Sequence, residues 1–275
     1  MRAQPDEPCL TPDAATLDPR TTLARPDLAE QALEGLVRAA AYRPVRPMQA
    51  SVALADIHAD ADPASERIDQ LIYGEAFDVL DQQGDRLWGR ARRDGLVGWI
   101  AASALRPGAR LPTHRVAAVA AALPLNALVA DPAEMSPDDL APIGAFESDP
   151  VAVAERLLGV PHSLGARSST ATDCAGLIQQ ALYACGLAGP RHADQQAELG
   201  HAVDRAEARR GDLVIWLAEP GDHSWTGHSA FMLDGDRVLH ATGCHGAVVI
   251  EAFAEADARC RAEGFAAPVF RRLQD

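Results

Sequence analysis

The stretch that organises the chain is TDCAGLIQQAL, Thr172 to Leu182. Its apolar residues recur at helical spacing, and Thr172 and Asp173 are typical of a helix start. The stretch therefore predicts a buried helix with Cys174 in its first turn. The positive end of a helix dipole and its free backbone N–H groups favour a thiolate over a thiol, so Cys174 is a candidate nucleophile. A buried structural cysteine is the common alternative.

Two histidines on a predicted β-hairpin favour the catalytic interpretation of this cysteine. Short apolar runs within 225–233 and 237–241 flank a turn signal, Asp234-Gly235-Asp236, and each run carries one histidine, His228 or His240. If Asp234 to Asp236 form a three-residue loop, both histidines lie on one face. A two-residue loop would place them on opposite faces unless a bulge intervened. A cysteine nucleophile needs a general base and a group that orients the base.

Four elements in this order resemble the NlpC-type cell-wall peptidases, papain-like enzymes that cut bacterial peptidoglycan stem peptides. The elements are a DCAGL helix start (173–177), a GDLVIW strand (211–216), HSA (228–230) and HA (240–241). The resemblance covers roughly residues 148 to 273. It implies that Cys174 is the nucleophile, His228 the base and His240 the orienting third residue, and it implies no cofactor.

The resemblance also implies a peptidoglycan-derived peptide as substrate, cleaved between γ-D-glutamyl and a diamino acid. The residues that it places around the substrate are Glu75, His162, Asp173, Ala175 and His192. For Glu75 the alternative is a solvated turn residue. His162 stands where the family has a tyrosine, Ala175 where it has a serine, and His192 where it often has an aspartate.

Two histidines suit a neutral or anionic group better than an ammonium. We therefore expect an altered pocket that does not prefer a free N-terminal L-alanine. The alternative is neutral drift in a pocket that still works as in the family.

The region before this predicted domain contains short strands. The expected strands are Ser51–Leu54, Gln70–Tyr73, Ala76–Asp81, Leu87–Arg92 and Val97–Ile100. Turns separate them, which predicts a small barrel over residues 48–110, and this barrel resembles the bacterial SH3-like modules that accompany these peptidases. Residues 1–26 predict a flexible arm and residues 27–47 an N-terminal helix capped by Asp27.

Residues 111–147 predict a linker or a degenerate second SH3-like module. Residues 148–275 are the predicted papain-like cysteine peptidase domain, which opens with a helix at 149–158. The expected fold class is α+β, a papain-like catalytic domain preceded by a small all-β SH3-like barrel.

Composition limits the partners and the compartment. The 275 residues carry a formal charge of −14, which argues against nucleic acid and against anionic membrane surfaces. No run is long enough to span a membrane, and residues 1–22 lack the apolar core of a secretory signal. Five scattered cysteines do not suggest a disulfide framework. We expect a cytoplasmic protein, or a periplasmic one if a signal has been lost, with no obligate protein partner.

Two other functions compete with the peptidase. A metal site is conceivable because five possible ligands are close in sequence: His223, His228, His240, Cys244 and His245. Their spacing matches no compact ligand pattern, so we expect no metal. The second competitor is a catalytically impaired module that binds the cell wall or a peptide. An amidase on an unrelated substrate is a further alternative.

Overall fold

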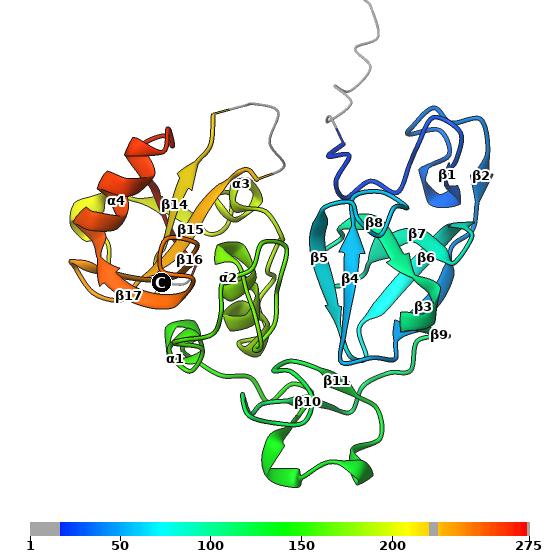
Figure 1. Ribbon diagram of the computed structural model, residues 1–275, viewed down its shortest axis with the longest axis horizontal. Coiled ribbons are helices and arrows are strands. Elements are labelled where there is room, and N and C mark those ends of the chain that lie inside the picture. The colour runs from blue at the N-terminus through cyan, green and yellow to red at the C-terminus, as the bar shows by residue number, and fades with distance from the viewer. Residues whose placement is uncertain (1–16, 220–224, 274–275) are drawn as a thin grey trace, which may run out of the picture.

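A computed structural model describes residues 17–219 and 225–273 of the chain. A helix-covered sheet domain at the C-terminal end lies beside an all-β domain, and a small third sheet spans both at one end of the molecule (Figure 1). The predicted α+β class is confirmed. No described helix is long and apolar enough to cross a membrane.

The all-β domain is one antiparallel sheet in strand order β5-β4-β8-β7-β6-β3-β9. Its elements are β3 (Arg46–Ala50), β4 (Leu54–His58), β5 (Arg67–Ile72), β6 (Ala76–Gln83), β7 (Arg86–Ala91), β8 (Val97–Ala101), the 3-10 turn η2 (Ala102–Ala104) and β9 (Leu105–Pro107). The predicted first strand at 51–54 is wrong, because the strand that pairs with β6 has already ended at Ala50. The other four predicted strands are confirmed, with ends that shift by a few residues. The inward side chains of the sheet form a core that includes Ile57, Phe77 and Ile100.

Residues 17–45, the described part of the segment before the barrel, contain no α-helix. Its elements are β1 (Ala29–Glu30), the 3-10 turn η1 (Gln31–Leu33) and β2 (Tyr42–Arg43). The predicted helix over 27–47 is therefore wrong. Leu28 is buried against Trp88 and Trp99, on the opposite face of the sheet from the barrel core, while Leu36 is exposed. In a helix Leu28 and Leu36 would share one face and be buried together. Because only Leu28 is buried, the helical spacing of the apolar residues does not reflect a helix here, and the segment packs on the sheet through Leu28.

The predicted flexible arm is also wrong where the structure describes it. Residues 1–16 lie outside the described part, but residues 17–26 are packed. Leu23 is fully buried, and Arg20 forms an ion pair of 2.7 Å with Asp194 in the C-terminal domain. The segment therefore connects the outer face of the barrel to the second domain.

The third sheet braces the two larger domains. It consists of β10 (His114–Val116), β11 (Leu128–Val129), β12 (Leu140–Pro142) and the 3-10 turns η3 (Pro132–Glu134) and η4 (Pro137–Asp139). Asn126 donates a hydrogen bond to the carbonyl oxygen of Gln180 at 2.9 Å, and its own carbonyl accepts one from Arg93 of the barrel. The descent of this sheet from a second SH3-like module stays a prediction.

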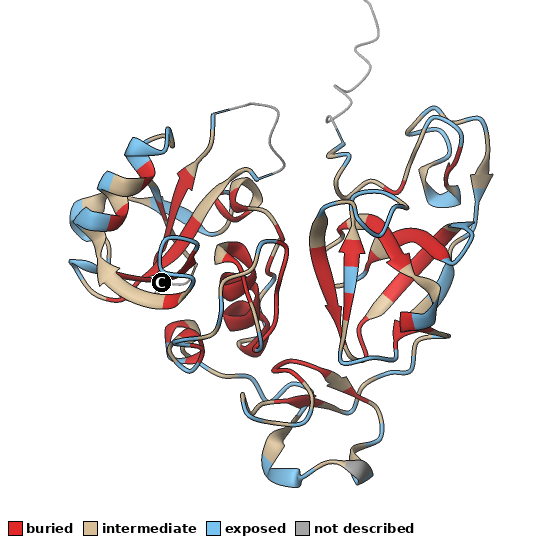
Figure 2. Ribbon diagram, in the orientation of Figure 1, coloured by how far each residue is buried: buried red, intermediate tan, exposed pale blue. Residues whose placement is uncertain are grey.

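The C-terminal domain is a six-stranded antiparallel sheet in the order β13-β18-β14-β15-β16-β17 with helices on both faces. Its elements are α1 (Pro150–Glu155), α2 (Cys174–Ala184), α3 (Ala193–Gln196), β13 (His201–Val203), the 3-10 turn η5 (Arg205–Glu207), β14 (Leu213–Leu217), β15 (Gly227–Met232), β16 (Arg237–Thr242), β17 (Ala247–Ala252), α4 (Phe253–Ala262) and β18 (Val269–Arg272). The predicted helices at 149–158 and at Cys174 are confirmed, and α2 is buried along almost its whole length (Figure 2).

A buried cluster of charges joins the barrel to the C-terminal domain. Arg167, which is fully buried, contacts Asp69 at 3.0 Å and Glu75 at 2.7 Å, both on the barrel. Arg191 contacts the same Asp69 at 3.1 Å and pairs with Asp173, the residue before Cys174. Burial raises the pKa of Asp69 to about 8 against the effect of the two arginines. Each arginine thus holds a carboxyl group of the other domain, so the orientation of the barrel is tied to the start of α2.

We predict that Arg167→Met destabilises the protein by about 3–5 kcal/mol, because Asp69 and Glu75 each lose one of the two arginines that they contact in the interior. The measurement is the free energy of unfolding from urea denaturation followed by circular dichroism. Arg210→Met is the matched control, since Arg210 also pairs with two carboxylates, Asp149 and Glu155, but these three side chains are 35–44% exposed to solvent. We expect a loss of about 1 kcal/mol or less in the control. Equal losses in the two variants would contradict the structural role of the cluster.

Candidate active site

Cys174 is the first residue of α2 and is capped as the sequence predicts. The Asp173 side chain accepts hydrogen bonds from the backbone N–H groups of Gly176 at 2.8 Å and Gly165 at 2.9 Å. The expected stabilisation of the thiolate is not found in this state. Burial, together with the Asp173 carboxylate, raises the pKa of the Cys174 thiol to about 11, although the backbone N–H of Ser229 acts in the opposite direction. The resting site therefore holds a neutral thiol at neutral pH.

The hairpin that carries the two histidines has the three-residue loop considered above. Phe231 pairs with Leu239, and the backbone N–H of Leu233 donates to the carbonyl oxygen of Arg237, so residues 234–236 form the loop. Asp234 fixes this loop by accepting two backbone N–H groups. The odd loop length keeps both histidines on one face of the sheet, as the sequence argument required.

The two histidine rings are in direct contact. Nε2 of His228 lies 2.7 Å from Nδ1 of His240, and their rings meet edge to face. Burial, followed by the neighbouring His240 and Arg259, lowers the pKa of His228 well below its ordinary range. His228 is therefore a neutral imidazole at neutral pH, which is the form that can accept a proton.

A carboxylate that sequence reasoning missed stands behind His240. Nε2 of His240, which is fully buried, lies 2.7 Å from Oε1 of Glu251 on β17. Glu251 is in turn paired with Arg259 on α4. The only signal in the sequence was an acidic residue in the otherwise apolar strand AVVIEA, and strand pairing was needed to bring it to the histidine.

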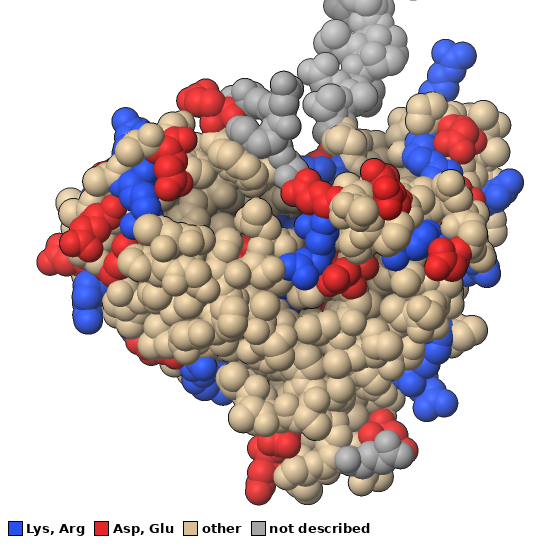
Figure 3. Space-filling view, viewed as in Figure 1, with Lys and Arg blue, Asp and Glu red and all other residues tan. Residues whose placement is uncertain are grey.

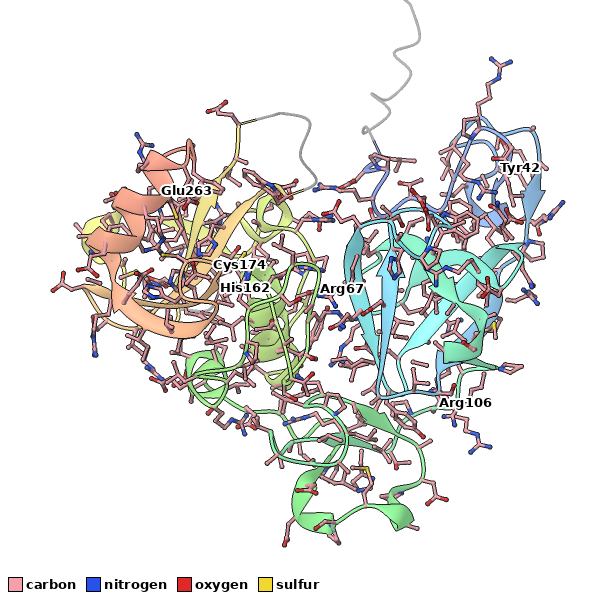
Figure 4. The ribbon with its side chains drawn as sticks, viewed as in Figure 1. Tyr42, Arg67, Arg106, His162, Cys174 and Glu263 are labelled. Carbon is pink, nitrogen blue, oxygen red and sulfur yellow. The ribbon has the colours of Figure 1, made fainter. Side chains whose placement is uncertain are left out.

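A cavity of about 560 Å³ opens at the junction of the barrel and the C-terminal domain. The residues that line it include Glu66, Arg67, Ile68, His162, Leu164, Asp173, Cys174, Ala175, His192, Trp225, His228, Cys244, Glu263 and Phe265. Figure 4 shows Cys174 and His162 together in the C-terminal domain and Arg67 on the side of the barrel that faces them. On the face drawn in Figure 3, acidic and basic side chains are interspersed. Both Cys174 and His228 thus reach the same cavity, with His240 behind His228.

Four of the five predicted substrate-binding residues line this cavity. Burial lowers the pKa of His162, and burial together with Arg191 lowers the pKa of His192 to about 4. Both imidazoles are therefore neutral at neutral pH. Ala175 contributes a small apolar side chain, while the carboxylate of Asp173 is occupied by the helix cap and by Arg191.

Glu75, the fifth predicted residue, does not face the cavity, and its predicted substrate role is wrong. Its side chain is 1% exposed and is held by Arg167 and Arg93, at 2.7 Å and 2.8 Å, and by the backbone N–H of Ile72. Although burial opposes ionisation, the two arginines lower the pKa of Glu75 to about 2. It is neither a substrate ligand nor a solvated turn residue, because it belongs to the charge cluster between the domains.

Other barrel residues take the place expected for Glu75. Glu66, Arg67 and Ile68, at the start of β5, form the barrel wall of the cavity. Arg67 also donates to Ser163 and to the carbonyl oxygen of Leu164, so this wall is fixed to the loop before α2. No pattern in the sequence distinguished these residues, because their role depends on how the two domains meet.

The five residues considered as metal ligands do not form one cluster in the described part of the chain. His223 lies outside the described residues. Cys244 and His245 are exposed in the turn between β16 and β17, and His228 and His240 bond to each other. Within residues 17–219 and 225–273 no group of three or more His, Cys, Asp or Glu side chains is arranged to hold a metal ion.

Comparison with known proteins supports this organisation. Residues 159–260 match the NlpC/P60 family, and residues 57–105 match the bacterial dipeptidyl-peptidase Sh3 domain. The chain is 30% identical over 106 residues to the peptidoglycan endopeptidase RipB of Mycobacterium tuberculosis, a match that covers 34% of this chain and 42% of that protein. It is also 30% identical over 92 residues to the murein DD-endopeptidase MepS/murein LD-carboxypeptidase of Escherichia coli, covering 33% and 47%. The matches thus span less than half the length of these two relatives.

A third relative, the gamma-D-glutamyl-L-lysine dipeptidyl-peptidase of Bacillus cereus, is 26% identical over 93 residues, covering 34% of this chain and 28% of that protein. The fold resembles the crystal structure of an NlpC/P60 family protein from Bacillus cereus, with a TM-score of 0.70, 16% identity, and coverage of 83% of this chain and all of that one. The chain therefore joins a domain of the NlpC/P60 family to a preceding bacterial dipeptidyl-peptidase Sh3 domain.

Proposed function

We propose that this protein is a cysteine peptidase that hydrolyses an amide bond in peptidoglycan stem peptides, between γ-D-glutamyl and a diamino acid. The observation that carries the proposal is the meeting of Cys174, at the start of a buried helix, with the His228–His240 pair at one cavity. The activities for which the three relatives are named support the substrate class. The bond itself is taken from the family resemblance.

In the proposed reaction the sulfur of Cys174 attacks the amide carbonyl carbon while its proton passes to His228. Nε2 of His228 is engaged by His240, so Nδ1 is the ring nitrogen left to accept this proton. The carbonyl becomes an oxyanion that backbone N–H groups at the start of α2 stabilise. Collapse breaks the C–N bond, the proton moves from His228 to the leaving amine, and water then hydrolyses the acyl-enzyme.

The cavity supports a substrate without a free amino terminus. The pocket carboxylate expected from Glu75 is buried elsewhere, that of Asp173 is occupied, and His162 and His192 are neutral. Glu66 and Glu263 are the remaining carboxylates among the described lining residues. We therefore propose that peptides with a blocked or acidic end bind better than peptides that begin with free L-alanine.

The raised pKa of the Cys174 thiol gives a prediction about pH. Because little thiolate is present at neutral pH, the rate at which iodoacetamide alkylates Cys174 should rise about tenfold per pH unit from about pH 6 to about pH 9. Mass spectrometry of the peptide that contains Cys174 measures this rate, with the exposed Cys244 in the same sample as an internal reference. A rate that is already constant above about pH 6 would show a thiolate–imidazolium pair instead.

Digestion of a stem-peptide panel tests the function itself. The panel pairs L-alanyl-γ-D-glutamyl-diaminopimelate with N-acetylated, muramyl-linked and acidic-end versions, and mass spectrometry identifies the cleaved bond. We expect Cys174→Ala to lose about 10⁴-fold or more in kcat, because no nucleophile remains, and Cys185→Ala, outside the cavity, to keep its activity. The N-acetylated, muramyl-linked and acidic-end peptides should be cleaved faster than the peptide with a free L-alanine amine.

A strong preference for the free amine in this panel would contradict the altered pocket but not the peptidase. No cleavage that depends on Cys174 would contradict the peptidase and would favour a binding module or an unrelated amide substrate.

A further inference from the structure

We infer that Glu251 is a positioning residue that fixes the tautomers of both catalytic histidines, so that His228 presents an unprotonated ring nitrogen to Cys174. The inference rests on the proposed function for the reaction it serves. It is argued from the distances within one series of hydrogen-bonding side chains, which runs from the cavity into the C-terminal domain.

The series consists of His228, His240 and Glu251. Nε2 of His228 lies 2.7 Å from Nδ1 of His240, and Nε2 of His240 lies 2.7 Å from Oε1 of Glu251. Nε2 of His240 is buried and makes no hydrogen bond of ordinary geometry with any described residue, so its 2.7 Å contact with Oε1 of Glu251 is the close polar contact it has there. Glu251 is thus the group that decides whether this nitrogen carries a proton.

An ionised carboxylate only accepts hydrogen bonds. A proton on Nε2 of His240 therefore satisfies both groups, whereas a lone pair there would face a carboxylate oxygen. With its proton on Nε2, a neutral His240 has a lone pair on Nδ1, which accepts from Nε2–H of His228. The remaining nitrogen of His228, Nδ1, then carries a lone pair. The opposite arrangement would place a proton on Nδ1 of His228, which could not accept the proton of Cys174.

The surroundings keep Glu251 ionised and in place. Its side chain is 8% exposed, and Arg259 of α4 donates to both of its oxygens. His245 approaches its second oxygen at 3.4 Å. Burial opposes ionisation, but the contacts with His240 and Arg259 lower the pKa of Glu251 far below its ordinary value. Besides Cys174, His162 from the loop before α2 also faces the histidine pair.

During attack a single proton moves, and it moves only from Cys174 to His228. It leaves the sulfur of Cys174 and binds Nδ1 of His228, which becomes an imidazolium, while the Nε2–H of His228 continues to donate to His240. The protons on His240 and the charge of Glu251 are unchanged. The carboxylate thus acts through His240, without touching the substrate.

The tautomers can be measured directly. The full chain with ¹⁵N-labelled histidine is studied by two-bond ¹H–¹⁵N correlation spectra at about pH 8, above the ordinary histidine pKa near 6.5. We expect protons on Nε2 of both His228 and His240. In Glu251→Gln the amide oxygen should face Arg259 and its NH₂ group should donate to Nε2 of His240, which moves both protons to Nδ1. The control is Glu255→Gln, an exposed carboxylate on α4 that should leave both tautomers unchanged.

Kinetics give the second readout. With a cleaved stem peptide, Glu251→Gln should lower kcat by about 10²-fold or more with little change in KM, because general-base assistance is lost. Glu251→Asp, which keeps the charge, should restore part of the rate and the wild-type tautomers. A proton on Nδ1 of His228 in the wild type, or unchanged tautomers in Glu251→Gln, would overturn the inference.

The two proposals can fail separately. If no stem peptide is cleaved but the tautomers are as expected, the proposed substrate is wrong and the role of Glu251 stands. If Glu251→Gln does not fold, which a melting curve would show, the spectra of the wild type and of Glu251→Asp still decide the question.

Discussion

The structure depends on a shared set of buried charges at the junction of its two larger domains. Asp69 of the barrel accepts contacts from both Arg167 and Arg191 of the C-terminal domain, and Arg191 continues to Asp173. Charges removed from water are tolerated only when each has its partner. The barrel is therefore not a loosely attached module, since moving it would leave carboxylates and guanidinium groups unpaired in the protein interior.

This constraint also shapes the active site. The Asp173 side chain accepts hydrogen bonds from the backbone N–H groups of Gly176 and Gly165 and from Arg191. Because Arg191 also contacts Asp69 of the barrel, the first turn of the helix that carries Cys174 is tied to the barrel. Gly165 allows the loop before α2 to approach closely, because a side chain there would overlap the backbone of Arg67. As a result, the barrel supplies one wall of the cavity while the nucleophile and the histidines supply the other.

On the side of the cavity away from the barrel, side-chain contacts between neighbouring strands hold the catalytic histidines in place. β15, β16 and β17 lie side by side and contribute His228, His240 and Glu251 in that order. Arg259 on α4, which packs on the same face of the sheet, pairs with Glu251 and ends the series. The nucleophile and its base thus sit between two sets of buried polar groups, one across the domain junction and one within the sheet.

The sequence alone determined the local features whose cause is local. A capping aspartate and an apolar stripe specify α2 and its first residue, Cys174, and a three-residue turn puts His228 and His240 on one face of a hairpin. It also indicated the all-β domain before them. It did not reveal that Leu28 belongs to a docked segment without a helix, because spacing alone does not say which surface an apolar residue meets.

Tertiary structure decided the rest, since contacts between distant segments have no signature in a short window of sequence. Glu75 reads as a turn residue that could face a ligand, yet the approach of Arg167 from the other domain buries it as a structural carboxylate. In the sequence Glu251 is an isolated charged residue in an apolar strand, yet strand pairing brings its carboxylate to Nε2 of His240. The nucleophile and its histidines were therefore readable from the chain, whereas the partners that set their protonation and the walls of their cavity exist only where two domains and three strands meet.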